Sequence, residues 1–456
     1  MTMAPVNETA SETAGETAGE TPGGAAQKQR AGLPRLLPLV PGVPEDLRAH
    51  LARYGRPPYR GGRGHLIEAV EQAGLTGRGG AAFHVHRKLA IVARARGRKV
   101  IVANGAESEP ASHKDALLLR AAPNLVLDGL QLAAEAIGAR EAYLYLHPGV
   151  SPEILRALNQ REAAGLDWLG VTIVEAPPRF LAGQESALVN RLGGGPAVPT
   201  FVPPRVSERG LGGAPTLVQN VETLAHLALI ARYGPRWFRA LGTAQEPGSM
   251  LTTVHTQPSG GSAGSSPPGQ HNTQIIEAEI GTPLRALIHQ DSVQAVLIGG
   301  FHGTWLPITT IGTLTLDNEA LKTHGAALGA GVIAALPADR CGLAEAARVV
   351  RYLAAESAGQ CGPCLNGLPR IAAAMAELAG RGHRGQVRAD LERWAGLVTG
   401  RGACNHPDGT VRFVRSALTV FAPEISLHAR GLCSATNRTP FLPLPGGMPM
   451  TEDDWT

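Results

Sequence analysis

Between about residues 62 and 230, short β-rich runs alternate regularly with amphipathic stretches, and few folds accommodate such a pattern. The runs KVIVAN (99–104) and EAYLYLHP (141–148) are typical of buried strands, whereas residues 117–137 and 152–163 carry apolar side chains at helical spacing. Strand–helix alternation predicts a mostly parallel sheet covered by helices. We therefore expect an α/β domain whose ligand binds at the carboxyl ends of its strands.

Two further regions follow this pattern. Between about residues 242 and 325, the apolar runs SMLTTVHT, TQIIEAEI and AVLIGG accompany one helical stretch, TPLRALIHQ, for which Thr282 would be the N-cap. These runs predict a small β-grasp-like module, interrupted by a surface loop at QPSGGSAGSSPPGQHN. From about residue 336 to the 420s, helical periodicity predicts a bundle. The expected division is a disordered tail (1–32), an α/β domain (33–240), the β-grasp-like module (241–330), the helical bundle (331–432) and an extended tail (433–456).

Composition excludes several classes of protein. The net charge of +4 comes mainly from scattered Arg residues without interleaved aromatics, so we expect no nucleic-acid partner, and an acidic protein partner is weakly favoured. No run of about 18 uncharged apolar residues predicts a membrane span. The polar ETAGETAGET repeat does not resemble a secretory signal. Five cysteines without such a signal favour metal or redox chemistry in the cytoplasm over disulfides.

A glycine-rich segment, GRGGAAF, occupies residues 77–83. Gly77, Gly79 and Gly80 would allow the backbone to approach a ligand closely. A helix that begins directly after the segment would present free N–H groups to a phosphate, and Lys88 would add a positive charge. The segment also has the composition of an ordinary glycine-rich turn, so by itself it leaves both interpretations open.

Three other segments place polar groups near the ends of predicted strands or the starts of helices. NGAESEP (104–110) directly follows the KVIVAN strand, while AGQESALVNRL (182–192) and QNVETL (219–224) each place amides and a carboxylate near a helix start. Such groups can bind a ring system or ribose hydroxyls, but turns and helix caps use the same residue types. The candidates are Asn104, Glu107, Glu109, Glu185, Asn220 and Thr223.

Cysteine spacing predicts a metal centre in the helical region. Cys361 and Cys364 form a C-x-x-C pair, and Cys404 follows in the segment RGACNHPDG. Three thiolates at one end of a bundle can hold an iron–sulfur cluster, or zinc with His406 or Cys433 as the fourth ligand. The spacing alone does not separate these two possibilities.

Taken together, the five motifs resemble the flavoprotein (NADH-binding, F-type) subunit of respiratory complex I and its relatives in hydrogenases and formate dehydrogenases, over about residues 62–421. NGAESEP is also similar to the C subunit of the Rnf electron-transport complex. The resemblance implies an α/β domain that binds flavin mononucleotide (FMN), a soluble-ligand-binding β-grasp module and an iron–sulfur bundle. It assigns cofactor contacts to Gly77, Arg78, Gly79, Gly80, Phe83, Lys88, Asn104, Glu107, Glu109, Gly183, Glu185, Asn220 and Thr223, and cluster ligands to Cys361, Cys364 and Cys404.

The chain departs from the family pattern at several positions. Ala358 stands where the family has its first cluster cysteine, so the resemblance implies a 4Fe–4S cluster, or a 3Fe–4S cluster unless another ligand replaces that thiol. Cys433 is our first candidate for that ligand, and Cys341 is expected to be a buried structural thiol. Val202 and Arg205 replace a Lys and a Phe that embrace the dinucleotide, and Ala82 replaces a loop glycine.

The expected function is therefore FMN- and iron–sulfur-dependent NADH dehydrogenase activity. Electrons would pass to a ferredoxin-like or quinone-linked iron–sulfur partner, with the chain peripheral to any membrane complex. Two alternatives remain at this stage. One is an electron-transfer subunit of the same fold that does not use NADH, as Val202 and Arg205 suggest. The other is a scaffold whose cluster site has decayed, as Ala358 suggests.

Overall fold

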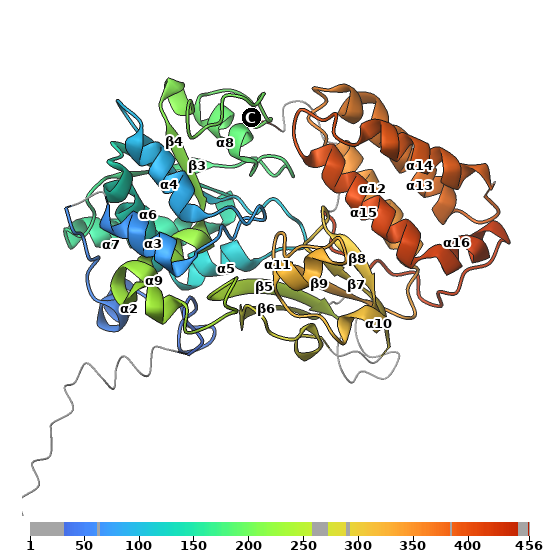
Figure 1. Ribbon diagram of the computed structural model, residues 1–456, viewed down its shortest axis with the longest axis horizontal. Coiled ribbons are helices and arrows are strands. Elements are labelled where there is room, and N and C mark those ends of the chain that lie inside the picture. The colour runs from blue at the N-terminus through green and yellow to red at the C-terminus, as the bar shows by residue number, and fades with distance from the viewer. Residues whose placement is uncertain are drawn as a thin grey trace, which may run out of the picture.

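A computed structural model of the protein describes residues 32–61, 64–257, 272–288, 292–383, 385–445 and 455. It contains an α/β region, a mixed-sheet module beside it and a helical bundle next to the module (Figure 1). Almost all of the expected disordered tail and of the Gly/Ser/Pro-rich loop lies outside the described residues. Within the described part of the chain, no helix has the length and apolar character needed to cross a membrane.

The α/β region contains a four-stranded sheet in the order β3-β2-β1-β4, and all its strands are parallel. Its strands are β1 (Val100–Gly105), β2 (Glu141–Leu146), β3 (Val171–Glu175) and β4 (Thr216–Asn220). Its helices are α2 (Leu47–Tyr54), α3 (His65–Ala73), α4 (Val85–Arg94), α5 (Lys114–Ala121), α6 (Pro123–Ile137), α7 (Ser151–Ala163), α8 (Glu185–Leu192) and α9 (Val221–Phe238). The predicted parallel α/β fold and its first two strands are confirmed.

The expected helix over residues 117–137 is divided into α5 and α6. Pro123 occupies the first turn of α6, where a missing N–H is tolerated, and so marks the break. Buried apolar side chains of α6 join those of α9 in one core. A Cβ on Gly129 would lie 1.9 Å from the Leu224 carbonyl oxygen, so only glycine permits this close approach of α6 to α9.

The module is a five-stranded mixed sheet in the order β6-β5-β9-β7-β8. Its strands are β5 (Ser249–Thr256), β6 (Asn272–Glu279), β7 (Val293–Ile298), β8 (Thr304–Pro307) and β9 (Val332–Pro337), with the short helices α10 (Ile308–Ile311) and α11 (Asn318–Lys322). The sheet includes β9, which lies beyond the expected boundary at residue 330. The three predicted strands are present.

The helix predicted over TPLRALIHQ is wrong for the described residues. Only one 3-10 turn, Leu284–Ala286, forms there. Thr282 does not cap it, because its hydroxyl donates to the Glu279 carbonyl oxygen (2.7 Å). Leu284 N donates to the Leu314 carbonyl oxygen, so the backbone pairs with a neighbouring segment instead of continuing a helix.

The predicted bundle is confirmed. It consists of α12 (Gly342–Ala355), a π-helical turn (Pro363–Gly367), α13 (Leu368–Ala379), α14 (Gln386–Val398), α15 (His406–Val420) and α16 (Ala422–Ala429). Their apolar faces form one core, which also includes Phe441 and Leu442 from the segment after α16. Residues 430–445 of this segment have no regular secondary structure and return to the start of the bundle, where Thr436 N and Asn437 N both donate to the Asp339 carbonyl oxygen.

Candidate functional site

A cavity of about 660 Å³ lies where the three regions meet. This volume is in the range typical of sites for small molecules and cofactors. The α/β region contributes strand-end and glycine-loop residues, the module contributes the glycines of its 299–303 loop, and the bundle contributes the start of α15. Among the lining residues are Arg78, Gly79, Gly80, Asn104, Glu107, Glu109, Lys114, Asp115, Gly183, Asn220, Gly299, His302, Cys404, His406 and Arg412.

The strand register explains how the sequence motifs converge. Asn104, the penultimate residue of β1, lies directly beside Asn220 at the end of β4, and the two strands are parallel. The side-chain amide of Asn104 donates to the Gly183 carbonyl oxygen (2.8 Å), which ties the loop before α8 to the sheet. Asn220 Oδ1 accepts from Glu222 N and caps α9, while its Nδ2 donates to Asp115 Oδ2 (2.6 Å). Three motifs therefore meet at one edge of the sheet.

The glycine-rich loop forms the adjacent wall. Arg78 N donates to Thr223 Oγ1 (2.8 Å), and a Cβ on Gly79 would come within 3.2 Å of the Asn220 Cβ. The Arg78 side chain is buried, and its Nε has no hydrogen-bond partner among the described residues. Burial lowers the pKa of Arg78, so the buried cation would be stabilised by an anionic ligand. This wall fits the phosphate of FMN.

Five of the predicted contacts do not line the cavity directly, and one of them, Thr223, instead accepts the hydrogen bond from Arg78 N. Gly77 N donates to the Phe83 carbonyl oxygen and closes the loop, and Phe83 itself is 43% exposed. Lys88 Nζ donates to the Val218 carbonyl oxygen (3.0 Å) and pairs with Glu185 (2.7 Å) behind the loop. The structure therefore brings Lys88 and Glu185 together, but it does not place either side chain in the cavity wall.

The acidic residues of the cavity differ in environment. Glu109 accepts hydrogen bonds from Phe301 N (2.7 Å) and Ala111 N (3.2 Å), yet its burial raises the pKa of its carboxyl group to about 8. Glu107 accepts from Asp115 N and from the Ser112 hydroxyl. Near neutral pH, Glu109 is therefore mainly a protonated carboxyl group at the junction with the module.

Sequence reasoning missed the ion pair of Lys114 and Asp115 in the cavity wall. Lys114 Nζ lies 2.8 Å from Asp115 Oδ1 and 2.7 Å from Glu222 Oε2, and both Lys114 and Asp115 are buried. Burial raises the pKa of Asp115 to about 7, against the opposing effect of Lys114. The only sequence signal was two adjacent opposite charges that begin a helix soon after NGAESEP. The contribution of the glycine loop between β7 and β8 was also missed.

The first thiol group consists of Cys361, Cys364 and Cys404. Burial raises the pKa of the Cys364 thiol to about 12, and its contact with Cys361 and the proximity of Cys404 add to the shift. Cys404 lines the cavity, so this group borders the space in which most of the predicted flavin contacts meet. Three thiols gathered at one end of the bundle fit the chemistry of an iron–sulfur cluster.

The position of the missing cysteine is filled by apolar packing. Ala358 packs against a small cluster that includes Leu181, Ala197 and Trp455. The Trp455 carbonyl oxygen accepts from Ala197 N (2.7 Å), and the Arg179 guanidinium lies 3.9 Å from the centre of its ring. Trp455 therefore packs close to the point at which the family would have a thiol.

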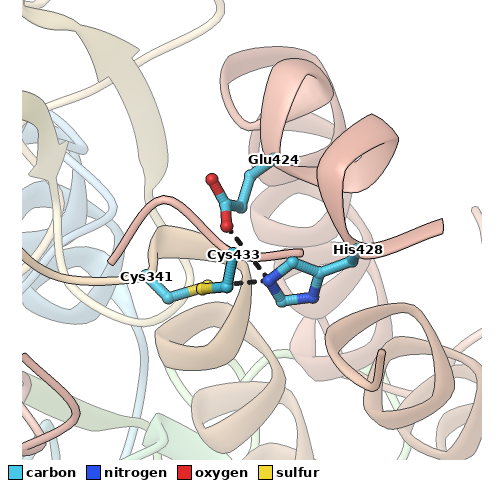
Figure 2. A group of neighbouring side chains, drawn as sticks. All are labelled: Cys341, Glu424, His428 and Cys433. Carbon is cyan, nitrogen blue, oxygen red and sulfur yellow. Dashed lines mark hydrogen bonds and ion pairs between the residues drawn. The ribbon is translucent and has the colours of Figure 1, made fainter. Parts of the chain in front are cut away.

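The second thiol group consists of Cys341, Glu424, His428 and Cys433, whose potential ligand atoms all lie within 4.8 Å of one another (Figure 2). Cys341 is the N-cap of α12, whereas Cys364 contacts Ser357, just after the C-cap of that helix. Since α12 has 14 residues, it spans about 21 Å.

The prediction that Cys433 completes the first group is therefore wrong, because Cys433 lies at the opposite end of α12. Cys341 belongs to the second group and is not an isolated structural thiol.

His406, the alternative fourth ligand, already uses both ring nitrogens. Its Nε2 donates to the Leu353 carbonyl oxygen (2.8 Å), which leaves Nδ1 to accept from Nε2–H of His302 (3.0 Å). Burial lowers the pKa of His406 to about 4, so the ring is neutral near pH 7. These contacts do not support His406 as a metal ligand.

Comparisons with known proteins assign two parts of the chain to known family regions. Residues 70–229 match the Nuo51 FMN-binding domain, and residues 344–428 match the iron–sulfur-binding region of NADH-ubiquinone oxidoreductase F. The latter range includes Cys361, Cys364 and Cys404, but neither Cys341 nor Cys433. FMN and a 4Fe–4S cluster, the cofactors predicted from the sequence, are thereby confirmed.

Curated relatives are similar over most of their length. The F 2 subunit of NADH-quinone oxidoreductase from Rhizobium meliloti is 30% identical, with 80% of this chain and 88% of the relative covered. The corresponding F subunit from Streptomyces coelicolor is 31% identical, with 80% and 83% covered. A solved NAD+-reducing nickel–iron hydrogenase in its air-oxidised state superposes with a TM-score of 0.71 at 29% identity, over 80% of this chain but only 62% of the hydrogenase chain. The chain therefore belongs to the family of NADH-quinone oxidoreductase F subunits.

Proposed function

We propose that this protein oxidises NADH at FMN held in the cavity and passes the electrons to an iron–sulfur cluster on Cys361, Cys364 and Cys404. One observation carries the proposal: strand-end residues such as Asn104 and the thiol-bearing Cys404 line the same cavity. FMN supplies the chemistry that links a two-electron donor to a one-electron acceptor. The cavity would bring the two cofactors close together.

The residues of this chain bind and tune the flavin. Arg78 and the N–H groups of the glycine-rich loop are available to the phosphate, while Asn104 and Asn220 present amides at the sheet edge. The protonated carboxyl group of Glu109 can donate a hydrogen bond or exchange a proton inside the cavity. Glu107 accepts hydrogen bonds from Asp115 N and Ala116 N at the start of α5, which hold its carboxyl group beside the cavity.

The three thiols fit a 4Fe–4S cluster in which one iron lacks a cysteine from this chain. Ala358→Cys tests this arrangement, because it restores a thiol next to Cys361 and Cys364 in sequence. We expect the variant to retain more iron per chain than the wild type after mild oxidation. An unchanged iron content and an unchanged electron paramagnetic resonance spectrum would show that position 358 does not face the cluster.

The partner is proposed to be another iron–sulfur subunit, and the chain to be a peripheral, cytoplasmic part of a larger assembly. The supporting observation is the family membership, since the relatives are named as subunits of NADH-quinone oxidoreductase. The hydrogenase chain matched in structure suggests a second type of assembly for the same fold.

A second candidate is electron transfer without NADH. Val202 and Arg205 stand where the family embraces the dinucleotide, and both are exposed on the segment before β4. Electrons would then reach FMN from a protein partner.

Anaerobic titration with NADH separates the two candidates. Protein reconstituted with FMN should lose its flavin absorbance at stoichiometric NADH, and a one-electron dye should restore it. A flavin that dithionite bleaches but NADH does not would favour the second candidate. Val202→Lys with Arg205→Phe supplies the matched comparison, because it restores the family pair and should speed the reduction of the flavin at low NADH concentration.

A further inference from the structure

We propose that Cys341, Glu424, His428 and Cys433 form a closed site for a single zinc ion, distinct from the iron–sulfur site. Figure 2 shows these side chains converging from the start of α12, from α16 and from the segment that follows it. Glu424 and His428 are one helical turn apart on the same face of α16. The proposal depends on these contacts and not on the redox function.

The spacing of the ligand atoms fits one ion. His428 Nε2 lies 3.1 Å from Glu424 Oε1 and 3.6 Å from Cys341 Sγ, and all four ligand atoms fall within 4.8 Å of one another. Zinc bonds of about 2.0–2.3 Å in a tetrahedron place ligand atoms roughly 3.3–3.8 Å apart. A 4Fe–4S cluster would hold its ligands further apart, because several irons and sulfides separate them.

The donor set also favours zinc. Two thiolates, one imidazole and one carboxylate make a borderline-soft set of four ligands, which is typical of tetrahedral zinc. The side chains of Glu424 and His428 are buried, and the thiol-bearing residues are partly buried, so little room remains for an open catalytic position. The site is therefore structural in type.

A neighbouring residue orients the carboxylate. Ser434 N donates to Glu424 Oε1 (2.9 Å), and the Ser434 hydroxyl donates to Glu424 Oε2 (2.5 Å). The Cys341 sulfur accepts from Ala344 N (3.4 Å) at the N-terminus of α12, where a negative charge is favoured. Such outer contacts are common around metal ligands.

The ion would fasten the C-terminal segment to the bundle. Beyond Cys433, Asn437 N donates to the Asp339 carbonyl oxygen, and Leu442 N donates to Glu345. A metal that joins Cys341 to Cys433 closes a long loop and reinforces these contacts. Removal of the ion should therefore loosen this segment.

Zinc and iron counted in the same purified full-length samples test the proposal. We expect about one zinc per wild-type chain, and at least a tenfold loss of zinc in Cys433→Ser with iron unchanged. Cys361→Ser is the matched control, because it should lose iron and keep zinc. A parallel loss of iron in Cys433→Ser would overturn the proposal in favour of a cluster ligand, and so would a wild type that binds no zinc when it is supplied.

Three measurements on the wild type protect the test against a variant that fails to fold. Cobalt substituted into the metal-depleted wild type should show thiolate-to-metal charge-transfer bands and intense visible bands of a tetrahedral site. Chelation of zinc should lower the thermal midpoint by several degrees while the flavin spectrum stays unchanged. Alkylation mapped by mass spectrometry should find Cys341 and Cys433 protected only with metal; a Cys341–Cys433 disulfide in the protein as isolated would contradict the proposal.

Discussion

The sheet wall and the bundle wall of the cavity are built from different kinds of contact. On the sheet wall, Asn104 and Asn220 are neighbours because they end adjacent parallel strands. On the bundle wall, Cys404 precedes α15, and its proximity to Cys361 depends on how the five helices of the bundle pack. Strand pairing fixes the first wall locally, whereas the second wall depends on the bundle core. Changes to the bundle wall should therefore affect iron and leave flavin in place, and changes to the sheet wall should do the opposite.

The largest effect is expected for Cys404→Ser. Loss of one of three thiolates should remove most of the cluster, because a serine oxygen is a poor iron ligand compared with a thiolate. Iron content should fall severalfold while the FMN content stays near that of the wild type. Equal losses of FMN and iron would break the proposed independence of the two walls.

A charge reversal at Lys88 probes the other wall. Lys88→Glu would face Glu185 at the site of the present 2.7 Å ion pair and place negative charge close to the glycine-rich loop. We expect FMN affinity to fall about tenfold or more, equivalent to at least about 1.4 kcal/mol. Arg87→Glu is the control, since Arg87 is the exposed neighbour on α4. Flavin titration should separate the two variants, and equal affinities would remove Lys88 from the site.

The raised pKa of Glu109, at the junction with the module, predicts that the free energy of unfolding depends on pH. The pKa of Glu109 is about 8 in the folded protein against an ordinary value of 4.5, so the folded state binds more protons between these values. The contribution of protonated Glu109 to the free energy of unfolding is therefore fully present below pH 4.5 and is lost as pH rises through 8.

Glu109→Gln should flatten this decline by an amount on the order of a few kcal/mol. Part of the slope should remain, because the pKa of Asp115 is also raised, to about 7. Denaturation of both proteins at pH 5 and pH 8 checks the expectation. If the stabilities of the two proteins change in parallel with pH, Glu109 is ionised throughout. Substitution of an exposed glutamate on α3, Glu68→Gln, supplies the baseline.

The smallest effect is expected at Ala82, on the glycine-rich loop. Ala82 has φ 47°, in the left-handed region that disfavours a Cβ. Ala82→Gly should raise the free energy of unfolding by about 0.5–1 kcal/mol. The steric cost that it removes from the folded state is larger than the stabilisation that the extra freedom of glycine gives the unfolded chain. Ala81→Gly should destabilise instead, because φ at Ala81 is not positive. Calorimetry that finds both variants destabilised would contradict this interpretation.

Local patterns in the sequence were sufficient to predict the parallel α/β fold, the bundle and the convergence of the strand-end motifs. Periodicity identifies strands such as β1, and parallel strands bring their carboxyl ends to one edge, so the neighbourhood of Asn104 and Asn220 follows from the motifs. The same reasoning failed for TPLRALIHQ, where pairing with Leu314 outweighs helix propensity.

The tertiary structure alone decided which thiols share a site. The position of Cys433 in the sequence allows it to reach either end of the bundle, because the sequence predicts no helix or strand there that would fix its direction. The length and direction of α12 put Cys341 and Cys361 at opposite ends, and the packing of Phe441 and Leu442 brings Cys433 to the Cys341 end. Burial likewise raises the pKa of Glu109, and this burial depends on tertiary packing against the module, whose Phe301 N lies far away in the sequence and contacts the carboxyl group.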